Sequence, residues 1–205
     1  NSKLELIKSQ NLYRQLKNSK IRNSHIIINR KSLLNFSSND YLGLSLQKSD
    51  RNFQSSSRLV SGNDESFQVI EKKLAKHKSQ NKSLIFPTGY MANIGIITTL
   101  IQKNDIIFSD KLNHASIIDA CKMSNAKTIV YKHNDLSDLE RKLRKKSGRK
   151  FIITEGVFSM DGDLADLKNI VKISESHNAI LILDDAHGDF VFGNDGKGTP
   201  SHFGV

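Results

Sequence analysis

The stretch A-I-L-I-L-D-D-A-H-G, from Ala179 to Gly188, decides how this chain folds. Its apolar half is uninterrupted and comes directly after a segment with helical periodicity. This combination is typical of a central strand of a parallel sheet, buried on both faces. The carboxylate of Asp184 then stands at the carboxyl end of that strand, where open α/β sheets bind their ligands. A carboxylate at the edge of an apolar core needs a hydrogen-bonding or cationic partner to stay ionised. Capping of the following turn is the alternative role for Asp184.

Upstream of this stretch, predicted helices alternate with predicted strands. Helices are expected at 67–78, 91–101, 115–123, 136–145 and 167–177, and strands at 83–86, 106–108, 128–131, 151–154 and 179–183. Such alternation predicts βαβ units, and therefore an α/β fold with a mostly parallel sheet and helices on both faces. The glycine-rich end, 188–204, contains no predicted helix or strand, so we expect the chain to be cut inside a larger fold.

The N-terminal quarter has a different pattern. Residues 2–18 carry Leu and Ile near helical spacing among polar residues, which predicts an amphipathic helix. Two short strands are expected at 26–29 and 33–36, and a long polar connection follows. We therefore expect two parts: an N-terminal helix and arm at 1–50, and a large, incomplete domain at 51–205.

Composition narrows the class of protein. The 205 residues carry a net charge of +10 and a single cysteine, Cys121, which excludes an internal disulfide framework and is typical of a reducing cytoplasm. No apolar run is long enough to span a membrane, and the N-terminus does not resemble a signal peptide. The basic run 141–150 closes an amphipathic helix without interleaved aromatic residues, which favours a solvated helix end over a nucleic-acid site. We expect a cytoplasmic protein that binds neither membranes nor nucleic acids.

Polar residues follow four of the predicted strands. In P-T-G-Y, the backbone N–H groups of Gly89 and Tyr90 would lie at a helix N-terminus, where they can hold a phosphate. His114 begins the next helix, and its ring can stack on an aromatic ligand or simply cap the helix. Glu155 and Ser159 follow another strand. Because the carboxyl ends of parallel strands meet at one edge of a sheet, we expect these groups to converge with Asp184.

Five motifs in this order resemble the α-oxoamine synthases, pyridoxal 5′-phosphate (PLP) enzymes of the type I aminotransferase fold. The motifs are N-F-S-S-N-D-Y-L-G-L (35–44), F-P-T-G-Y-M-A-N (86–93), D-K-L-N-H-A-S-I-I-D (110–119), T-E-G-V-F-S-M-D-G-D (154–163) and L-D-D-A-H-G (183–188). The first, fourth and fifth, with H-N-D (133–135), are most similar to the biotin-pathway branch. That branch condenses L-alanine with pimeloyl-CoA or a pimeloyl carrier protein and releases carbon dioxide. The third motif is equally similar to a branch that joins glycine to an acetyl group.

The resemblance implies a PLP site and a homodimer, and no metal. Asp184 would pair with the pyridine nitrogen of PLP, and His187 with Ser159 would contact its phenolic oxygen. Gly89 and Tyr90 would bind its phosphate through backbone N–H groups.

The resemblance also implies substrate contacts. His114 would stack on the cofactor ring and face the substrate, so it counts as catalytic together with Asp184 and His187. Asn39 matches a family position near the amino-acid substrate, and Arg14 matches an arginine that contacts the acyl substrate.

The chain departs from the family pattern at three places. Residues 53–58 (F-Q-S-S-S-R) replace a glycine-rich G-x-G segment, and Phe67 stands where the family often has histidine. The lysine that forms the Schiff base in the family lies beyond the last residue of this chain. A non-catalytic partner subunit of the same fold is therefore the alternative to an enzyme. An intact Asp184 favours the enzyme, because an inert subunit has no need for a carboxylate that holds a pyridinium.

Overall fold

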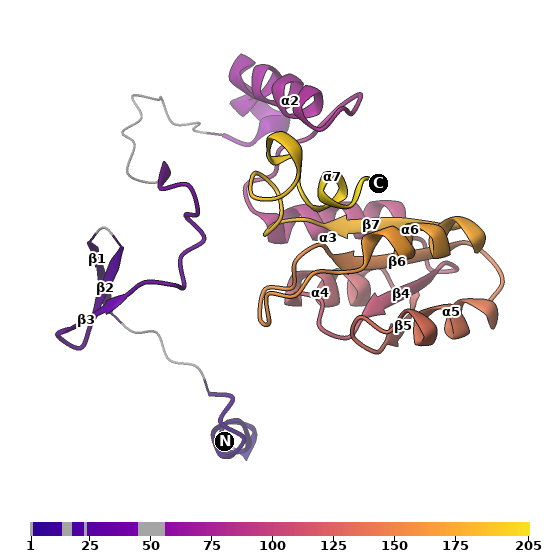
Figure 1. The fold of residues 1–205 in the computed structure, drawn as a ribbon, viewed down its shortest axis with the longest axis horizontal. Helices are drawn as coiled ribbons and strands as arrows, with labels where there is room; N and C mark the ends of the chain where they lie inside the picture. Colours follow the sequence, from indigo (N-terminus) through magenta and orange to yellow (C-terminus); the bar gives the residue numbers. More distant parts are fainter. Residues whose placement is uncertain (1, 14–17, 23, 45–55) are drawn as a thin grey trace. The chain divides into compact units, whose positions relative to one another are not determined.

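The chain divides into two units, Asn1–Arg51 and Asn52–Val205. The computed structural model describes residues 2–13, 18–22, 24–44 and 56–205 (Figure 1). Among these residues, no helix combines the length and the apolar character needed to cross a bilayer.

Unit 1 contains one helix and an antiparallel meander: α1 (Ser2–Ser9), β1 (Ser19–Arg22), β2 (His25–Ile28) and β3 (Lys31–Leu34). The two predicted strands correspond to β2 and β3, whereas β1 was not expected. The predicted helix over 2–18 is too long, because Asn11 adopts a left-handed conformation (φ 55°) and the Leu12 N–H donates to the carbonyl of Ile7 at 3.0 Å. This arrangement closes the last helical turn and ends α1.

Unit 2 alternates helices and strands as predicted. Its elements are η2 (Arg58–Gly62), α2 (Glu65–His77), α3 (Gly89–Leu100), β4 (Ile106–Asp110), α4 (Ala115–Met123), β5 (Lys127–Tyr131), α5 (Leu136–Arg144), β6 (Lys150–Glu155), α6 (Leu167–Ser176), β7 (Ala179–Asp184), η3 (Asn194–Gly196) and α7 (Thr199–Phe203). The four strands form a parallel sheet in the order β5-β4-β6-β7. The predicted α/β class is therefore confirmed.

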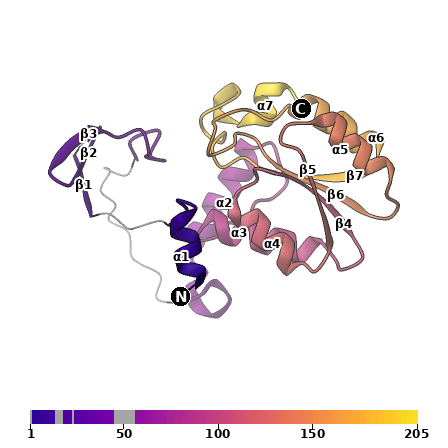
Figure 2. The same ribbon diagram turned by 90° about the horizontal axis from the view of Figure 1, so that it is seen from below.

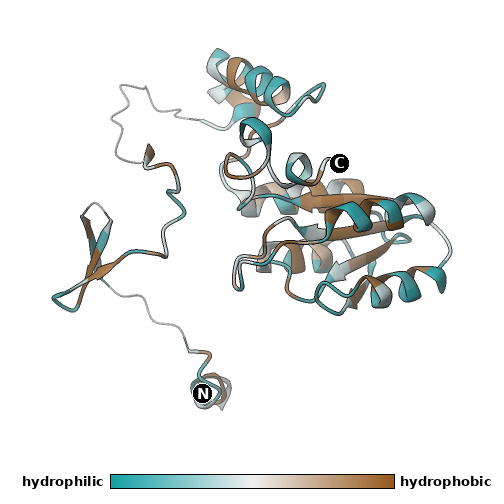
Figure 3. Ribbon diagram, viewed as in Figure 1, coloured by the Kyte–Doolittle hydropathy of each residue, from teal (hydrophilic) through white to brown (hydrophobic). Residues whose placement is uncertain are grey.

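Alternate side chains of the central strands pack in two separate hydrophobic cores, one on each face of the sheet. Ile107 of β4 and Ile153 of β6 pack with α3 and α4 on one face of the sheet. Phe108 and Ile152, their neighbours in sequence, pack with α5 and α6 on the other face. Figure 2 shows these helix pairs on opposite sides of the sheet, and Figure 3 shows β7 in the hydrophobic colour and α5 largely in the hydrophilic one.

The strand order creates a crevice at one point of the sheet. Strands β4 and β6 are neighbours, but β4 leads into α4 on one face and β6 leads into α6 on the other. Ligands of open α/β sheets bind outside the carboxyl ends of strands at such a switch point. The residues that follow β4 and β6 are therefore the first candidates for a site.

Two expectations about the sheet are wrong. Strand β7 is an edge strand of the described sheet rather than a central one, and Ile180 is 44% exposed. Residues 83–86 form no strand, because their backbone groups bond to side chains instead. The Ile85 N–H donates to Glu71 Oε1 at 2.9 Å, and the Ile85 carbonyl accepts from Arg58 Nη1 at 3.1 Å.

The segment 188–204 is also more regular than expected, because it contains α7. Pro200 lies in the first turn of this helix, and Gly204 ends it in a left-handed conformation (φ 68°). Asp185, next to Asp184, holds the helix in place. Its carboxylate accepts hydrogen bonds from the backbone N–H of Thr199 at 2.9 Å and from the Thr199 hydroxyl at 2.6 Å.

We expect Gly188→Ala to destabilise the full-length protein by about 1–3 kcal/mol, the usual cost of overpacking. A Cβ at Gly188 would overlap Asp185 Oδ1 and the methyl group of Thr199. Gly89→Ala is the matched control, because a Cβ there meets no heavy atom within 4 Å. Urea unfolding of both variants measures the difference, and an equal loss in the two would contradict this packing.

Candidate active site

Asp184 ends β7 with both carboxylate oxygens bonded. Oδ2 accepts from the Asn93 side-chain amide at 2.7 Å, and Oδ1 accepts from the backbone N–H of Ala186 at 3.0 Å. These two donors satisfy both oxygens of the half-buried carboxyl group without a cationic side chain. The bond from Ala186 is the turn cap that was the alternative role for Asp184. The bond from Asn93 is not part of that cap, because it connects β7 to α3. Each oxygen retains accepting capacity for a ligand.

Asn93 brings helix α3 to the end of β7. Gly89, the first residue of α3, lies one helical turn before Asn93 and therefore on the same side of the helix. Thr88 caps α3 by accepting from the Met91 N–H at 3.1 Å. The start of α3 thus presents backbone N–H groups and the positive end of the helix dipole near Asp184, as an anion site requires.

The side chain of Tyr90 makes a hydrogen bond of its own, separate from the role predicted for the Tyr90 backbone. Its hydroxyl donates to Asp119 Oδ2 at 2.6 Å, which joins α3 to α4, and this bond raises the pKa of the phenol above its usual value. The side chain is therefore engaged with α4, and the predicted phosphate contact concerns the backbone N–H of Tyr90.

Glu155 connects the ends of β4 and β6. Its Oε1 accepts from the backbone N–H of His114 at 2.5 Å, and the backbone of Ser159 also favours the charged form of the carboxyl group. Glu155 is 3% exposed and stands beside Asp184 in the strand register. Burial, together with the charge of Asp184, raises the pKa of Glu155 to about 7 despite these effects. This carboxyl group thus fixes the backbone of His114, a residue that was predicted to contact the cofactor.

Ser159 lies in a tight loop that is fastened by His133. The ring of His133 bridges two carboxylates, with Nδ1 2.9 Å from Asp110 and Nε2 2.9 Å from Asp163. Asp163 belongs to the loop, where its carbonyl accepts from the Phe158 N–H at 2.9 Å. Burial opposes the charged ring, but the bonds and charges of both aspartates raise the pKa of His133 overall. The loop that carries Ser159 is therefore tied to the end of β4.

The remaining predicted residues are placed as follows. His187 is half-buried in the turn after β7, which is closed by the Asp189 N–H donating to Asp185 O at 2.8 Å. Asn39 lies in an exposed bend of unit 1, and Arg14 lies outside the described residues. The roles of these three residues remain predictions.

Two residues of the site, Asn93 and His133, were not predicted, and neither was the bond that Glu155 makes there. Asn93 had a signal, since it is a polar side chain inside the apolar run of 91–97. Glu155 had been considered only as a carboxylate at this edge, because its bond to the His114 N–H depends on the register of β4 against β6. For His133 the only signal in the sequence was its position in the motif H-N-D. Its hydrogen-bond partners could not be predicted, because they come from segments that are distant in the sequence.

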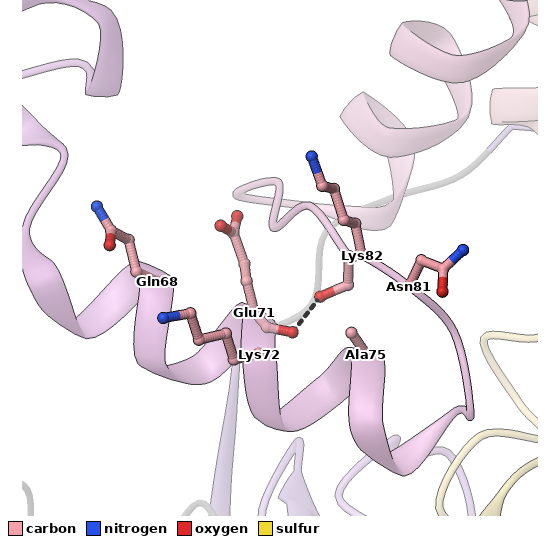
Figure 4. A pocket seen from close by; sticks show the side chains of 7 residues that line it. Gln68, Glu71, Lys72, Ala75, Asn81 and Lys82 are labelled. Atoms are coloured by element: carbon pink, nitrogen blue, oxygen red, sulfur yellow. Dashed lines mark hydrogen bonds between the residues drawn. The ribbon is translucent and has the colours of Figure 1, made fainter.

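A separate depression of about 470 Å³ lies on α2 and the segment that follows it (Figure 4). Six of the seven residues that line it are of polar or charged types, including Lys72 and Lys82, and the Ser83 hydroxyl donates to the Glu71 carbonyl at 2.7 Å. None of the predicted site residues lines it. Within the described part of the chain, no cluster of three or more His, Cys, Asp or Glu side chains is arranged to hold a metal.

A family model described as aminotransferase class I and II matches residues 31–203. The chain belongs to this family. The predicted resemblance to the α-oxoamine synthases is confirmed by the curated relatives. 8-Amino-7-oxononanoate synthase from Lysinibacillus sphaericus is 45% identical over 216 residues, which cover 98% of this chain and 56% of that protein. 8-Amino-7-oxononanoate synthase 2 from Bacillus subtilis is 44% identical over 186 residues, which cover 83% and 47%.

Solved structures confirm the predicted aminotransferase-like fold. Sphingomonas wittichii serine palmitoyltransferase matches with a TM-score of 0.86 at 28% identity, covering 100% of this chain and 55% of that one. 8-Amino-7-oxononanoate synthase from Francisella tularensis matches with a TM-score of 0.68 at 36% identity, covering 83% and 50%. The chain spans about half the length of the relatives that it matches.

We expect Glu155→Gln to change how stability depends on pH. In the unfolded chain Glu155 ionises near its ordinary pKa of 4.5, but in the folded chain only near 7. Folding is therefore opposed increasingly as pH rises through this window, by up to about 3 kcal/mol, and glutamine removes the penalty.

Urea unfolding of the full-length apoprotein at pH 5 and pH 8 measures this effect. The stability of the wild type relative to Glu155→Gln should fall between the two pH values. Glu140→Gln is the control, because Arg144 lowers the pKa of Glu140 and no such fall is expected. A pH-independent difference for Glu155→Gln would show that its carboxyl group is ionised across the whole range.

Proposed function

We propose that the full-length protein is a PLP-dependent acyltransferase, 8-amino-7-oxononanoate synthase. It would condense L-alanine with pimeloyl-CoA or a pimeloyl carrier protein, with loss of carbon dioxide, in biotin synthesis. The observation that carries the proposal is the Asp184 carboxylate, held by Asn93 at the end of β7 and facing the start of α3. The names of the curated relatives support the reaction, and a related serine palmitoyltransferase structure contains PLP.

The residues present fit PLP. When bound, PLP supplies an electron sink that stabilises a carbanion at the amino-acid α-carbon. Asp184 would hold a proton on the pyridine nitrogen, a role for which a carboxylate fixed by two hydrogen bonds is well suited. The N–H groups of Gly89 and Tyr90 would hold the phosphate at the start of α3, which a Cβ-free Gly89 leaves open.

Five other side chains would act around the cofactor and the substrates. His114 would lie against the ring, and its backbone is fixed by Glu155. Ser159 and His187 would share the phenolic oxygen. Asn39 would lie near the amino acid, and Arg14 near the acyl group.

Two neighbouring reactions are the alternatives. The motif at 110–119 also resembles a glycine-using branch, and the fold also matches serine palmitoyltransferase. A panel of L-alanine, glycine and L-serine against pimeloyl-, acetyl- and palmitoyl-CoA distinguishes them, because the proposed enzyme releases carbon dioxide fastest with L-alanine and the pimeloyl thioester. A full-length protein that binds no PLP and turns over none of these pairs would be the non-catalytic subunit.

We expect Asp184→Asn to lower the rate of L-alanine α-proton exchange roughly a hundredfold to a thousandfold, because charge stabilisation in a water-poor site contributes several kcal/mol. Folding and cofactor content should stay near wild type, since asparagine caps the turn nearly as well. Asp189→Asn, the same change at the ion pair with Lys78, is the control. Exchange at the wild-type rate in Asp184→Asn would leave Asp184 a structural residue.

We expect the full-length protein to be a homodimer, located in the cytoplasm. Support comes from unit 1, which leaves large apolar side chains uncovered within itself, including Phe36 at 90% exposure. Sedimentation equilibrium at micromolar concentration measures the mass. A monomer under these conditions would contradict the proposal.

A further inference from the structure

The hydrogen bonds of His114 define which of its ring nitrogens carries a proton. His114 is the N-cap of α4, and its Nδ1 accepts from the backbone N–H of Ser116 at 3.2 Å. A backbone amide always carries its hydrogen, so Nδ1 must present a lone pair. A neutral imidazole has one protonated and one unprotonated nitrogen. The proton of the His114 ring therefore resides on Nε2.

The Ser116 hydroxyl is compatible with this assignment and extends the network. Its oxygen lies 2.8 Å from His114 Nδ1 and accepts a hydrogen bond from Asn93 Nδ2 at 2.9 Å. Because Asn93 donates to the oxygen and Nδ1 has no proton to give, the single hydroxyl hydrogen points to Nδ1. Ser116 is 1% exposed, so solvent does not compete for this bond.

Asn93 extends the chain of hydrogen bonds to Asp184. Its Nδ2 group has two hydrogens, one for the Ser116 hydroxyl and one for Asp184 Oδ2 at 2.7 Å. A flipped amide would place its oxygen against the carboxylate, and two acceptors repel one another. The carboxylate of Asp184 thus orients the Asn93 amide, the amide orients the Ser116 hydroxyl, and the hydroxyl orients the His114 ring.

We infer that Asn93 and Ser116 are positioning residues that hold His114 as its Nε2–H tautomer and connect its ring to the carboxylate of Asp184. The relay occupies Nδ1, so Nε2–H is the donor that His114 offers to a bound substrate. This last consequence rests on the proposed function, whereas the tautomer does not.

The tautomer is measured in the full-length apoprotein labelled with ¹⁵N-histidine. Long-range ¹H–¹⁵N correlation spectra separate protonated from unprotonated ring nitrogens, and loss of a signal set in His114→Gln assigns the residue. We expect Nδ1 of His114 to resonate as an unprotonated nitrogen and Nε2 as a protonated one. A protonated Nδ1 would overturn the inference.

Variants test the relay itself. Ser116→Ala leaves only the longer backbone donor, so both ring signals of His114 should move toward the average of the two tautomers, and Asn93→Leu should move them in the same direction. Ser116→Thr keeps the hydroxyl and should restore the wild-type pattern. Ser124→Ala is the matched control, a buried serine at the other end of α4 whose hydroxyl bonds to the Cys121 carbonyl. His114 signals unchanged in both Ser116→Ala and Asn93→Leu would overturn the relay.

Kinetics of the PLP-loaded protein provide a second readout. Loss of one hydrogen bond in Ser116→Ala should slow L-alanine α-proton exchange about three- to tenfold. Combining Ser116→Ala with Asn93→Leu should cost less than the product of the two effects, because both break one relay, whereas Ser124→Ala should combine independently. Strict multiplication of the first pair would count against the relay. If the protein binds no PLP, the proposed function fails, and the apoprotein spectra still decide the tautomer.

Discussion

The hydrogen bond from the His114 backbone to the Glu155 carboxylate joins the two strand ends on which the site depends. At 2.5 Å it spans the crevice between β4 and β6, where the chain passes from one face of the sheet to the other. Helix α4 cannot shift along β4 without breaking this bond. The position of the His114 ring is therefore set from the sheet, and the side chains that follow β6 and β7 are placed relative to it.

The carboxyl end of this sheet brings three acidic side chains close together. Asp110, Glu155 and Asp184 end three neighbouring strands, and among the described residues Asp110 bonds to the ring of His133, whereas no histidine, lysine or arginine side chain is bonded to the other two. Glu155 and Asp184 accept hydrogen bonds from backbone N–H groups and, for Asp184, from a side-chain amide. Glu155 consequently holds its proton to an unusually high pH. A positive charge bound at Asp184 would lower the pKa of Glu155, because the charge of Asp184 is one of the causes that raise it.

The alternation of helices and strands was predictable because it is local. Apolar runs such as that of β6 and capping residues such as Asp166 before α6 lie in the sequence next to the elements that they define. The segment 83–86 shows where such reasoning fails. It has the composition of a strand, but strand formation needs a neighbour, and in unit 2 the Ile85 backbone is bonded to Glu71 and Arg58 instead.

The sequence could predict which residues of the candidate site follow the strands, because the ends of parallel strands converge. It could not predict the contacts that other elements make there. Asp184 and His114 follow apolar runs directly, so their placement at one edge required only the sheet. Asn93 lies 91 residues from Asp184, and its donation to that carboxylate depends on how α3 is rotated on the sheet. That rotation is set by packing, in which Ile97 and Ile101 turn inward against Ile107 and Phe151. With these residues buried, the preceding turn of α3 brings the Asn93 amide between Asp184 and Ser116. The packing of the apolar face of α3 therefore determines which groups Asn93 contacts. The hydrophobic pattern of the sequence marks the core positions of α3, but it does not show which residues of other elements lie beside the adjoining turn.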